Sequence, residues 1–267
     1  MRSIDPHIHM YSRVTDDYER MALAGIAAII EPSFWLGQPR TSVATLVDYW
    51  EALLGYEAQR ARQFGVEHFC TLSLNPKEAN DPRMMGALDF LDEYLTRPGV
   101  VGVGEIGFDT LSPAEEEAFR RQLLIGDRRK APIIIHTAHL NKYESVRRIL
   151  EIIRAERVAE ERIVVDHNTE ETIELCLATG VMAGITVYPL TKMSPFRAVN
   201  LMRRYGTDRI LINSSADWGI SDPLSVPHTA QEMRQAGFRW EDIDKVLYQN
   251  PFNFFKQSSN FTFAGVE

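Results

Sequence analysis

The stretch "VVGVGEIGFD" (residues 100–109) decides between two architectures for this chain. It begins with a continuous apolar run, Val100–Val103, which is typical of a strand buried on both faces of a parallel sheet. It also matches the pattern G-x-G-x-x-G through Gly102, Gly104 and Gly107, which in an open doubly wound sheet would mark a dinucleotide-binding loop. We reject that interpretation, because no helix is predicted to start at Gly107 and the next strand ends at His136, with no acidic residue to hold a ribose.

Similar apolar runs recur along the 267-residue chain, and each is followed by turn residues and then by a helical pattern. This alternation of strand and helix, repeated about eight times, predicts an α/β fold of the (β/α)8 TIM-barrel type, with residues 1–267 forming a single domain. The expected strands are Ser3–Asp5, Gly25–Ile30, His68–Leu72, Val100–Val103, Pro132–Ile135, Arg162–Val165, Val181–Ile185 and Ile210–Ile212.

Helix signals lie between several of these runs. Ser112, Pro113 and Glu115 form the pattern of a capping box with proline at the first helical position. Apolar residues at helical spacing then predict helices over Ser112–Leu124, Tyr143–Ile153 and Thr172–Ala178.

Composition and charge narrow the class of protein. A hydrophobic fraction of 45% and a charged fraction of 25% are ordinary for a globular protein, and a net charge of −8 argues against a broad nucleic-acid footprint. The two cysteines, Cys70 and Cys176, are far apart and predict no disulfide framework. Because the amino terminus lacks a signal-peptide pattern and Leu23–Ile30 is too short to span a bilayer, we expect a cytoplasmic protein without membrane segments.

Histidines and carboxylates gather where the expected strands end, which is where TIM barrels carry their chemistry. His7 and His9 follow the first strand and are spaced so that their imidazoles would project to the same side. Asp217, beyond the eighth strand, could close a metal site with them, since strands one and eight are adjacent in a closed barrel.

A second ion is predicted at His136 and His167, which follow the adjacent strands five and six. Glu105, at the end of strand four, could bridge the two ions with one carboxylate oxygen to each. Histidine-rich ligands favour zinc, although manganese, iron or magnesium also suit such a set. The expected chemistry is attack by a metal-bridging hydroxide, with Asp217 taking its proton and passing it to the leaving group.

Together these motifs resemble the TatD-related metal-dependent hydrolases of the amidohydrolase superfamily. The resemblance is carried by the H-x-H after strand one, by "VGEIGFD" (Val103–Asp109), by single histidines after strands five and six, by the aspartate after strand eight and by the terminal "NPFNFF" (Asn250–Phe255). It implies a TIM barrel with a two-metal centre and phosphodiester hydrolysis, often on DNA. The metal roles would fall to His7, His9, Glu105, His136, His167 and Asp217.

Three segments depart from the pattern of that family. After strand five the chain reads "HTAH", with Ala138 where the family commonly has arginine and with His139 beside it. The segment after strand six reads "DHNTEE" and that after strand eight "NSSADWG". These changes keep the hydrolase class but argue against DNA cleavage, and they suggest a divergent branch acting on a small metabolite.

The expected loops after the strands carry several cations, which would steer an anionic substrate toward the metals. These are Arg13, Arg40, Lys77, Arg83, Lys142, Lys192 and Arg197. We therefore expect a phosphate ester or another anionic small molecule, with nucleic acid less favoured. Two alternatives remain: an amide or lactone hydrolase with the same metals, and a non-catalytic metal-binding barrel.

The sequence leaves the roles of three further side chains open. Phe34 and Trp35 could form an apolar wall for substrate or pack against neighbouring loops, and Asp166 could orient a metal-bound imidazole or bind loop amides.

Overall fold

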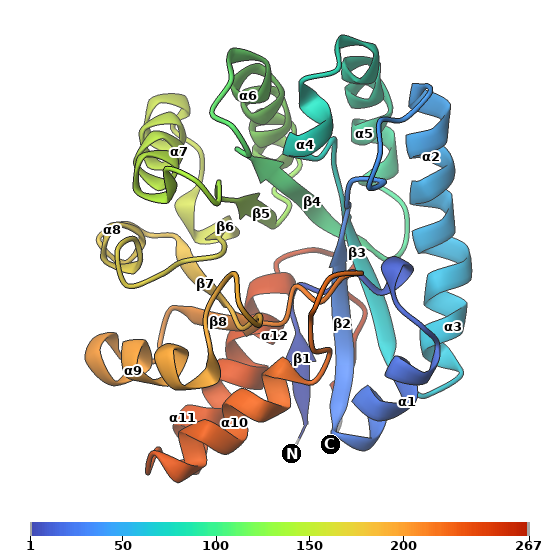
Figure 1. The fold of residues 1–267 in the computed structure, drawn as a ribbon. Helices are drawn as coiled ribbons and strands as arrows, with labels where there is room; N and C mark the ends of the chain where they lie inside the picture. Colours follow the sequence, from blue (N-terminus) through green and yellow to red (C-terminus); the bar gives the residue numbers. More distant parts are fainter. Residues whose placement is uncertain (1, 266–267) are drawn as a thin grey trace.

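Eight parallel strands form one sheet whose spatial order follows the sequence, as the ribbon shows (Figure 1). The computed structural model describes residues 2–265. Because every strand pairs in parallel with the next and the intervening segments are helical, the predicted (β/α)8 barrel is confirmed. The strands are β1 Ser3–Asp5, β2 Ile26–Pro32, β3 Glu67–Leu72, β4 Val100–Gly107, β5 Ile133–His136, β6 Ile163–Val165, β7 Met182–Thr186 and β8 Ile210–Asn213.

The helices form a ring outside the strands (Figure 1). The three helices expected from apolar spacing are present as α6, α7 and α8, with ends shifted by one to four residues. Among the residues that the structure describes, no helix combines the length and the apolar character that crossing a bilayer requires. The helices are α1 Asp16–Leu23, α2 Val43–Ala52, α3 Ala58–Arg62, α4 Pro76–Ala79, α5 Leu88–Tyr94, α6 Pro113–Arg128, α7 Lys142–Glu156, α8 Ile173–Leu177, α9 Pro195–Tyr205, α10 Ser225–Gln235, α11 Trp240–Asp244 and α12 Asn250–Phe255.

The glycines of β4 allow that strand to lie close against β5. A Cβ atom at Gly102 would lie 2.2 Å from the carbonyl oxygen of Pro132, and one at Gly107 would lie 2.3 Å from that of His136. The G-x-G-x-x-G pattern therefore reflects strand packing. β4 also continues to Gly107, beyond the expected end at Val103, so Glu105 lies inside the strand rather than after it.

The barrel closes through the chain that follows the first and last strands. The N–H of Ser215 donates to the carbonyl oxygen of His7 at 2.7 Å, and the N–H of His9 donates to that of Ala216 at 2.9 Å. These bonds bring the segment after β8 beside the histidines that follow β1.

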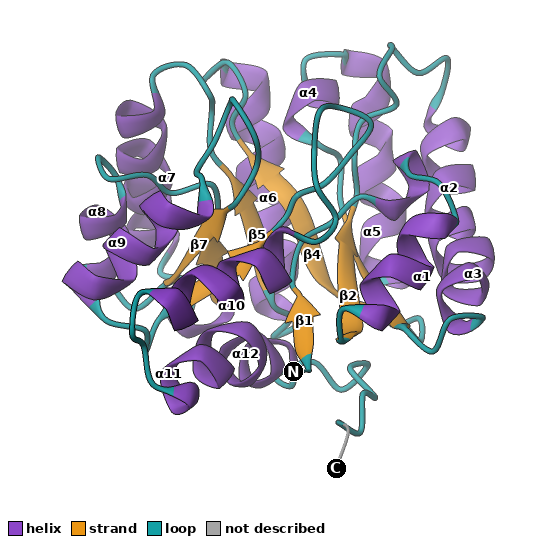
Figure 2. Ribbon diagram, turned by 60° about the horizontal axis from the view of Figure 1, so that its bottom comes forward, coloured by secondary structure: helices purple, strands orange, loops and turns teal. Residues whose placement is uncertain are grey.

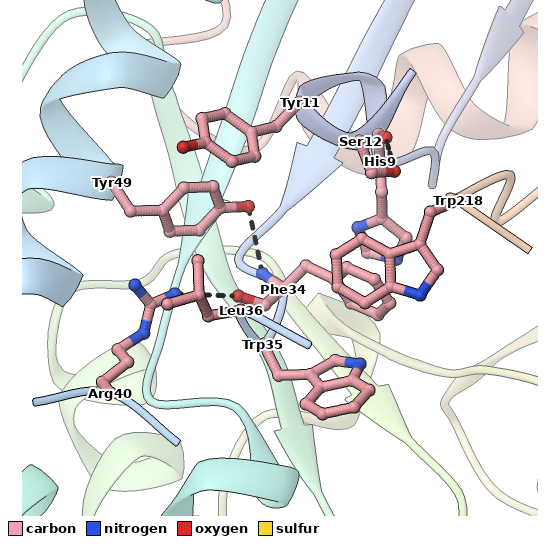
Figure 3. Close-up of a pocket in the computed structure, with 9 residues that line it drawn as sticks. All are labelled: His9, Tyr11, Ser12, Phe34, Trp35, Leu36, Arg40, Tyr49 and Trp218. Carbon is pink, nitrogen blue, oxygen red and sulfur yellow. Dashed lines mark hydrogen bonds between the residues drawn. The ribbon is translucent and has the colours of Figure 1, made fainter. Parts of the chain in front are cut away.

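Apolar side chains fill the barrel interior below this point. Ile4, Phe69, Val101 and Ile134 belong to one buried cluster with Phe254 and Phe255 of α12. Both chain ends that the structure describes lie at the amino-terminal ends of the strands, and the loops that follow the strands lie at the opposite face (Figure 2). The loops after β1, β2 and β8 bring aromatic side chains together on that carboxyl-terminal face (Figure 3). Packed side chains therefore close the amino-terminal end of the barrel, which leaves the carboxyl-terminal end for a functional site.

Glu115, on the first turn of α6, anchors the loop that follows β4. As the capping box predicts, Ser112 Oγ accepts the N–H of Glu115 at 3.1 Å. The fully buried carboxylate of Glu115, however, accepts the backbone N–H groups of Asp109, Thr110 and Leu111 at 3.1, 2.9 and 2.9 Å. This side chain thus satisfies three donors of the loop.

Replacing Glu115 with alanine should destabilise the fold by about 3 kcal/mol, because three backbone N–H groups of the loop would lose their acceptor. Urea unfolding followed by circular dichroism measures the effect. Glu117→Ala, at an exposed position of the same helix, is the control and should change the unfolding free energy by less than about 0.5 kcal/mol. Equal stabilities of the two variants would contradict this role.

Candidate metal centre

Five of the six residues predicted to bind metal lie together at the carboxyl-terminal end of the barrel. They come from four places in the fold: the end of β1, the interior of β4, the end of β5 and the position after β6. All five are buried, at 7% exposure or less. The five are His7, His9, Glu105, His136 and His167.

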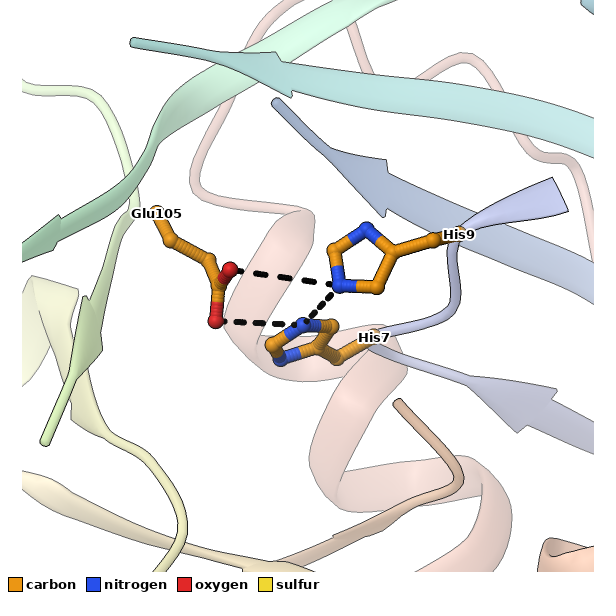
Figure 4. Close-up of side chains that lie close together, drawn as sticks. All are labelled: His7, His9 and Glu105. Atoms are coloured by element: carbon orange, nitrogen blue, oxygen red, sulfur yellow. Dashed lines mark hydrogen bonds and ion pairs between the residues drawn. The ribbon is translucent and has the colours of Figure 1, made fainter. Parts of the chain in front are cut away.

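His7, His9 and Glu105 form one group of potential ligands, drawn in Figure 4. His7 Nε2 lies 3.0 Å from His9 Nε2 and 3.3 Å from Glu105 Oε1. Glu105 Oε2 lies 3.9 Å from His9 Nε2. Ligand atoms around a tetrahedral zinc ion are about 3.3 Å apart, because each lies about 2.0–2.1 Å from the metal. The spacing of these atoms therefore suits a shared ion.

Glu105 also belongs to a second group, with His136 and His167. Its Oε1 atom lies 3.1 Å from His136 Nδ1 and 3.2 Å from His167 Nε2, and those two nitrogens are 3.1 Å apart. One carboxylate is thus common to two histidine pairs, and its Oε1 atom lies within 3.3 Å of three of the four imidazoles.

Asp166 orients His7 from behind. Its Oδ2 atom lies 2.5 Å from His7 Nδ1, which leaves Nε2 directed toward His9 and Glu105. Asn213, the last residue of β8, donates to both oxygens of Asp166 at 2.8 and 3.0 Å. Asp166 also accepts the N–H of His167 at 2.9 Å, so both interpretations left open by the sequence apply. A carboxylate behind a histidine fixes the tautomer and the ring orientation of a metal ligand.

Asp217 lies outside these groups. Its Oδ1 atom accepts the hydroxyl of Tyr188 at 2.8 Å and the N–H of Gly219 at 2.7 Å. The chain after β8 turns at Ser215, whose φ of 43° is left-handed, and this segment is already bonded to the backbone after β1. The structure thus does not bring Asp217 together with His7 and His9, and the carboxylate beside His7 comes from the "DH" dipeptide after β6 instead.

Burial and neighbouring charges set the protonation of the candidate ligands. Burial lowers the pKa values of His9 and His167 well below the usual range. Burial raises the pKa of Glu105, but His7 and His136 outweigh it and hold that pKa well below its usual range. Burial also lowers the pKa of His7, but Glu105 and Asp166 outweigh it and raise that pKa. His9 and His167 as neutral imidazoles and Glu105 as an ionised carboxylate are in the forms that bind divalent metal ions.

Most of the loop cations expected to attract an anion are already neutralised. Arg13, Arg40, Lys77, Arg83 and Arg197 each form an ion pair with a carboxylate. Within residues 2–265, Lys142 and Lys192 have no carboxylate at ion-pair distance. Lys142 Nζ donates to Thr137 Oγ1 at 2.9 Å, and Lys192 Nζ donates to Ser215 Oγ at 3.1 Å.

After burial, the charge of Lys192 contributes to lowering the pKa values of His9 and His167. Burial lowers the pKa of Lys192, while the carboxylates of Glu105, Asp166 and Asp217 oppose that effect. Burial and then the charge of Lys192 lower the pKa of Lys142 to about 8 and that of His139 to about 4. The charges of the two lysines thus act on each other, and both favour a neutral His139.

Gly184 of β7 leaves the space that Asp166 occupies, because a Cβ atom there would lie 2.2 Å from Asp166 Oδ1. Gly184→Ala should displace this carboxylate, release His7 and weaken metal binding by about tenfold. Metal affinity is measured by calorimetry, with circular dichroism to verify the fold. Gly55→Ala is the control, since a Cβ atom at Gly55 would meet nothing within 4 Å. Unchanged affinity in Gly184→Ala would exclude the positioning role of Asp166.

Comparison with known proteins identifies the family. The model of the TatD-related DNase family matches residues 4–256. An uncharacterized metal-dependent hydrolase of Methanocaldococcus jannaschii is 30% identical over 259 residues, which cover 95% of this chain and 99% of the relative. A 3′-5′ ssDNA/RNA exonuclease TatD of Erwinia amylovora is 25% identical over 220 residues, covering 74% of this chain and 82% of the relative. The crystal structure of a TatD-like protein from Archaeoglobus fulgidus superposes with a TM-score of 0.78 at 24% identity, covering 95% of this chain and 99% of that one. The chain therefore belongs to the TatD-related DNase family and is a metal-dependent hydrolase.

Proposed function

We propose that this protein hydrolyses esters of a small anionic molecule, phosphate esters foremost, with two divalent ions held by the five clustered residues. The observation that carries the proposal is the pair of lysines beside the centre, Lys142 and Lys192, which lack carboxylate partners among the described residues. Both lysines are partly buried, and an ammonium group in such a place without a counter-ion is unfavourable, so an anionic substrate would supply that counter-ion.

The proposed ligand sets follow the two groups of side chains. His7 and His9 would hold one ion and His136 and His167 the other, with Glu105 common to both. Zinc suits this histidine-rich set best, and manganese, iron or magnesium could also occupy it. Two ions held by these ligand sets would lower the pKa of a water molecule toward neutrality and stabilise the attacking and leaving oxygens.

For Asp217 we propose proton transfer from outside the ligand set. Its Oδ1 atom is fixed by Tyr188 and Gly219, while Oδ2 accepts no hydrogen bond from the described residues. The carboxylate of Asp217 also raises the pKa of Lys192, which supports a position near the centre. Oδ2 is therefore the atom that would accept the proton of the attacking water and return it to the leaving group.

Asp217→Asn should keep two ions per chain and lower kcat by about a hundredfold, because the amide cannot accept the proton. Elemental analysis of protein purified without chelator gives the metal content, and steady-state kinetics give kcat. Loss of one ion in the variant would make Asp217 a metal ligand, as the sequence pattern suggests. Unchanged kcat with both ions present would rule out the proton-transfer role.

A small substrate agrees better with this surface than a long nucleic acid does. The net charge of the chain is −8, and five of the loop cations are paired with carboxylates. A strand of nucleic acid needs a cationic groove along many phosphates, whereas two adjacent lysines suit one anionic group.

The substrate class is tested with a panel of phosphate monoesters, phosphate diesters, neutral lactones, amides and short single-stranded DNA. Lys192→Met should raise KM for phosphate esters at least about tenfold, because a charge-assisted contact is lost. KM for any neutral substrate should not change. Lys130→Met, at an exposed position, is the control.

Turnover confined to lactones or amides would replace the phosphate ester proposal with the amide and lactone alternative. If the protein cleaves only DNA efficiently, it would instead have the nuclease activity for which the family is named. Bound metal without turnover of any substrate would indicate a non-catalytic barrel.

We also propose that the protein works in the cytoplasm. Cys70 and Cys176 are buried free thiols, which agrees with a reducing compartment.

A further inference from the structure

An aromatic pocket lies beside the metal centre on the carboxyl-terminal face of the barrel (Figure 3). We use the name aromatic pocket for the cavity bounded by six apolar or aromatic side chains. Three loops, after β1, β2 and β8, and the helix α2 supply these side chains. The six are Tyr11, Phe34, Trp35, Leu36, Tyr49 and Trp218.

The aromatic pocket adjoins the candidate metal centre through His9, which lines it. The ring of Phe34 stacks on the His9 imidazole, with ring centroids 3.9 Å apart, and also contacts Trp218 at a centroid distance of 4.9 Å. His9 Nε2 meanwhile lies 3.0 Å from His7 Nε2 in the ligand group. A molecule in this pocket would therefore lie against one of the proposed metal ligands.

The walls of the aromatic pocket are already held in place. The side chain of Arg13 bridges the loops after β1 and β8 by donating to the carbonyl oxygen of Asp217 at 2.7 Å and to Ser221 Oγ at 2.9 Å. The N–H of Phe34 donates to the hydroxyl of Tyr49 at 3.2 Å. Loops fixed in this way bind a ligand with little ordering cost.

The aromatic pocket offers no free charge to an occupant. Arg40 reaches its edge, but its Nε atom donates to Glu78 Oε1 at 2.7 Å and its Nη1 atom to the carbonyl oxygen of Thr45 at 2.9 Å. This guanidinium is therefore neutralised and fully engaged. Aromatic walls without a free charge suit a neutral, flat group.

The size of the aromatic pocket limits that group to about one ring. The cavity measures about 130 Å³. An apolar cavity of about 150 Å³ is known to hold one benzene molecule in another protein. A single six-membered ring thus fills this pocket, and a fused bicyclic ring would project from it.

We propose that the aromatic pocket binds a neutral, monocyclic aromatic ring of the substrate, with the anionic group of that substrate reaching Lys192 across the metal centre. This inference rests on the proposed function, which it deepens by naming an aryl ester as the substrate class. The lysines come from the segments after β5 and β7, whereas the aromatic pocket is built by the segments after β1, β2 and β8. The two halves of an aryl ester would therefore contact different parts of the barrel mouth.

The test compares the binding of phenylphosphonate and methylphosphonate to the metal-loaded protein by calorimetry, so that no turnover is needed. Phenylphosphonate should bind about tenfold more tightly, because its ring leaves water. Trp218→Ala and Tyr11→Ala should abolish this preference, since both side chains are about half exposed and their loss leaves the core intact (48% and 45%). Trp240→Ala, at an exposed position of α11, is the matched control and should keep it.

Equal affinities for the two phosphonates in the unmodified protein would overturn the inference, and so would a preference that survives in both pocket variants. Lys192→Met should weaken both ligands to the same degree and leave their ratio unchanged. A ring preference that depends on Trp218 without any turnover of phenyl phosphate would refute the proposed hydrolysis while leaving the aromatic pocket established.

Discussion

The arrangement of this site depends on one buried carboxylate that two histidine pairs share. The Oε1 atom of Glu105 lies 3.3 Å from His7 Nε2, 3.1 Å from His136 Nδ1 and 3.2 Å from His167 Nε2. Four imidazoles in a buried space would repel one another if charged, and unpaired they would be costly to bury. The ionised carboxylate of Glu105 lies between them and balances positive charge on the imidazoles.

That position requires β4 to run close to β5. Glycines at 102 and 107 permit this approach, since a side chain at either position would meet the backbone of the next strand. Glu115 then holds the loop after β4 from below, and Gly184 leaves room for Asp166 behind His7. Small residues and buried hydrogen bonds thus determine where the ligands point, although none of them is itself a ligand.

The surroundings of the centre divide into two chemically different parts. Lys142 and Lys192 provide positive charge that no described carboxylate neutralises, while the aromatic pocket is apolar and its one arginine is engaged by Glu78. A substrate that is anionic at one end and aromatic at the other would satisfy both parts. Membership of the TatD-related family establishes metal-dependent hydrolysis. The two lysines and the aromatic pocket would determine which substrate is bound.

The sequence by itself determined the barrel, because eight continuous apolar runs alternate with helical patterns, and it determined five clustered residues, because strand ends must meet at one face of such a fold. Only the tertiary structure decided the rest. Asp217 and Asp166 both follow strands, but the left-handed turn at Ser215 directs the first toward Tyr188, while the pairing with Asn213 holds the second against His7. Seven loop cations look alike in the sequence, and five of them pair with carboxylates in the fold. Two of these pairs are local in the chain, and three join distant segments: Arg40 with Glu78, Lys77 with Asp109 and Arg197 with Glu170. Side-chain pairing between distant loops leaves no periodic signal in the chain, and that is why the ligand neighbours and the substrate walls could not be read from it.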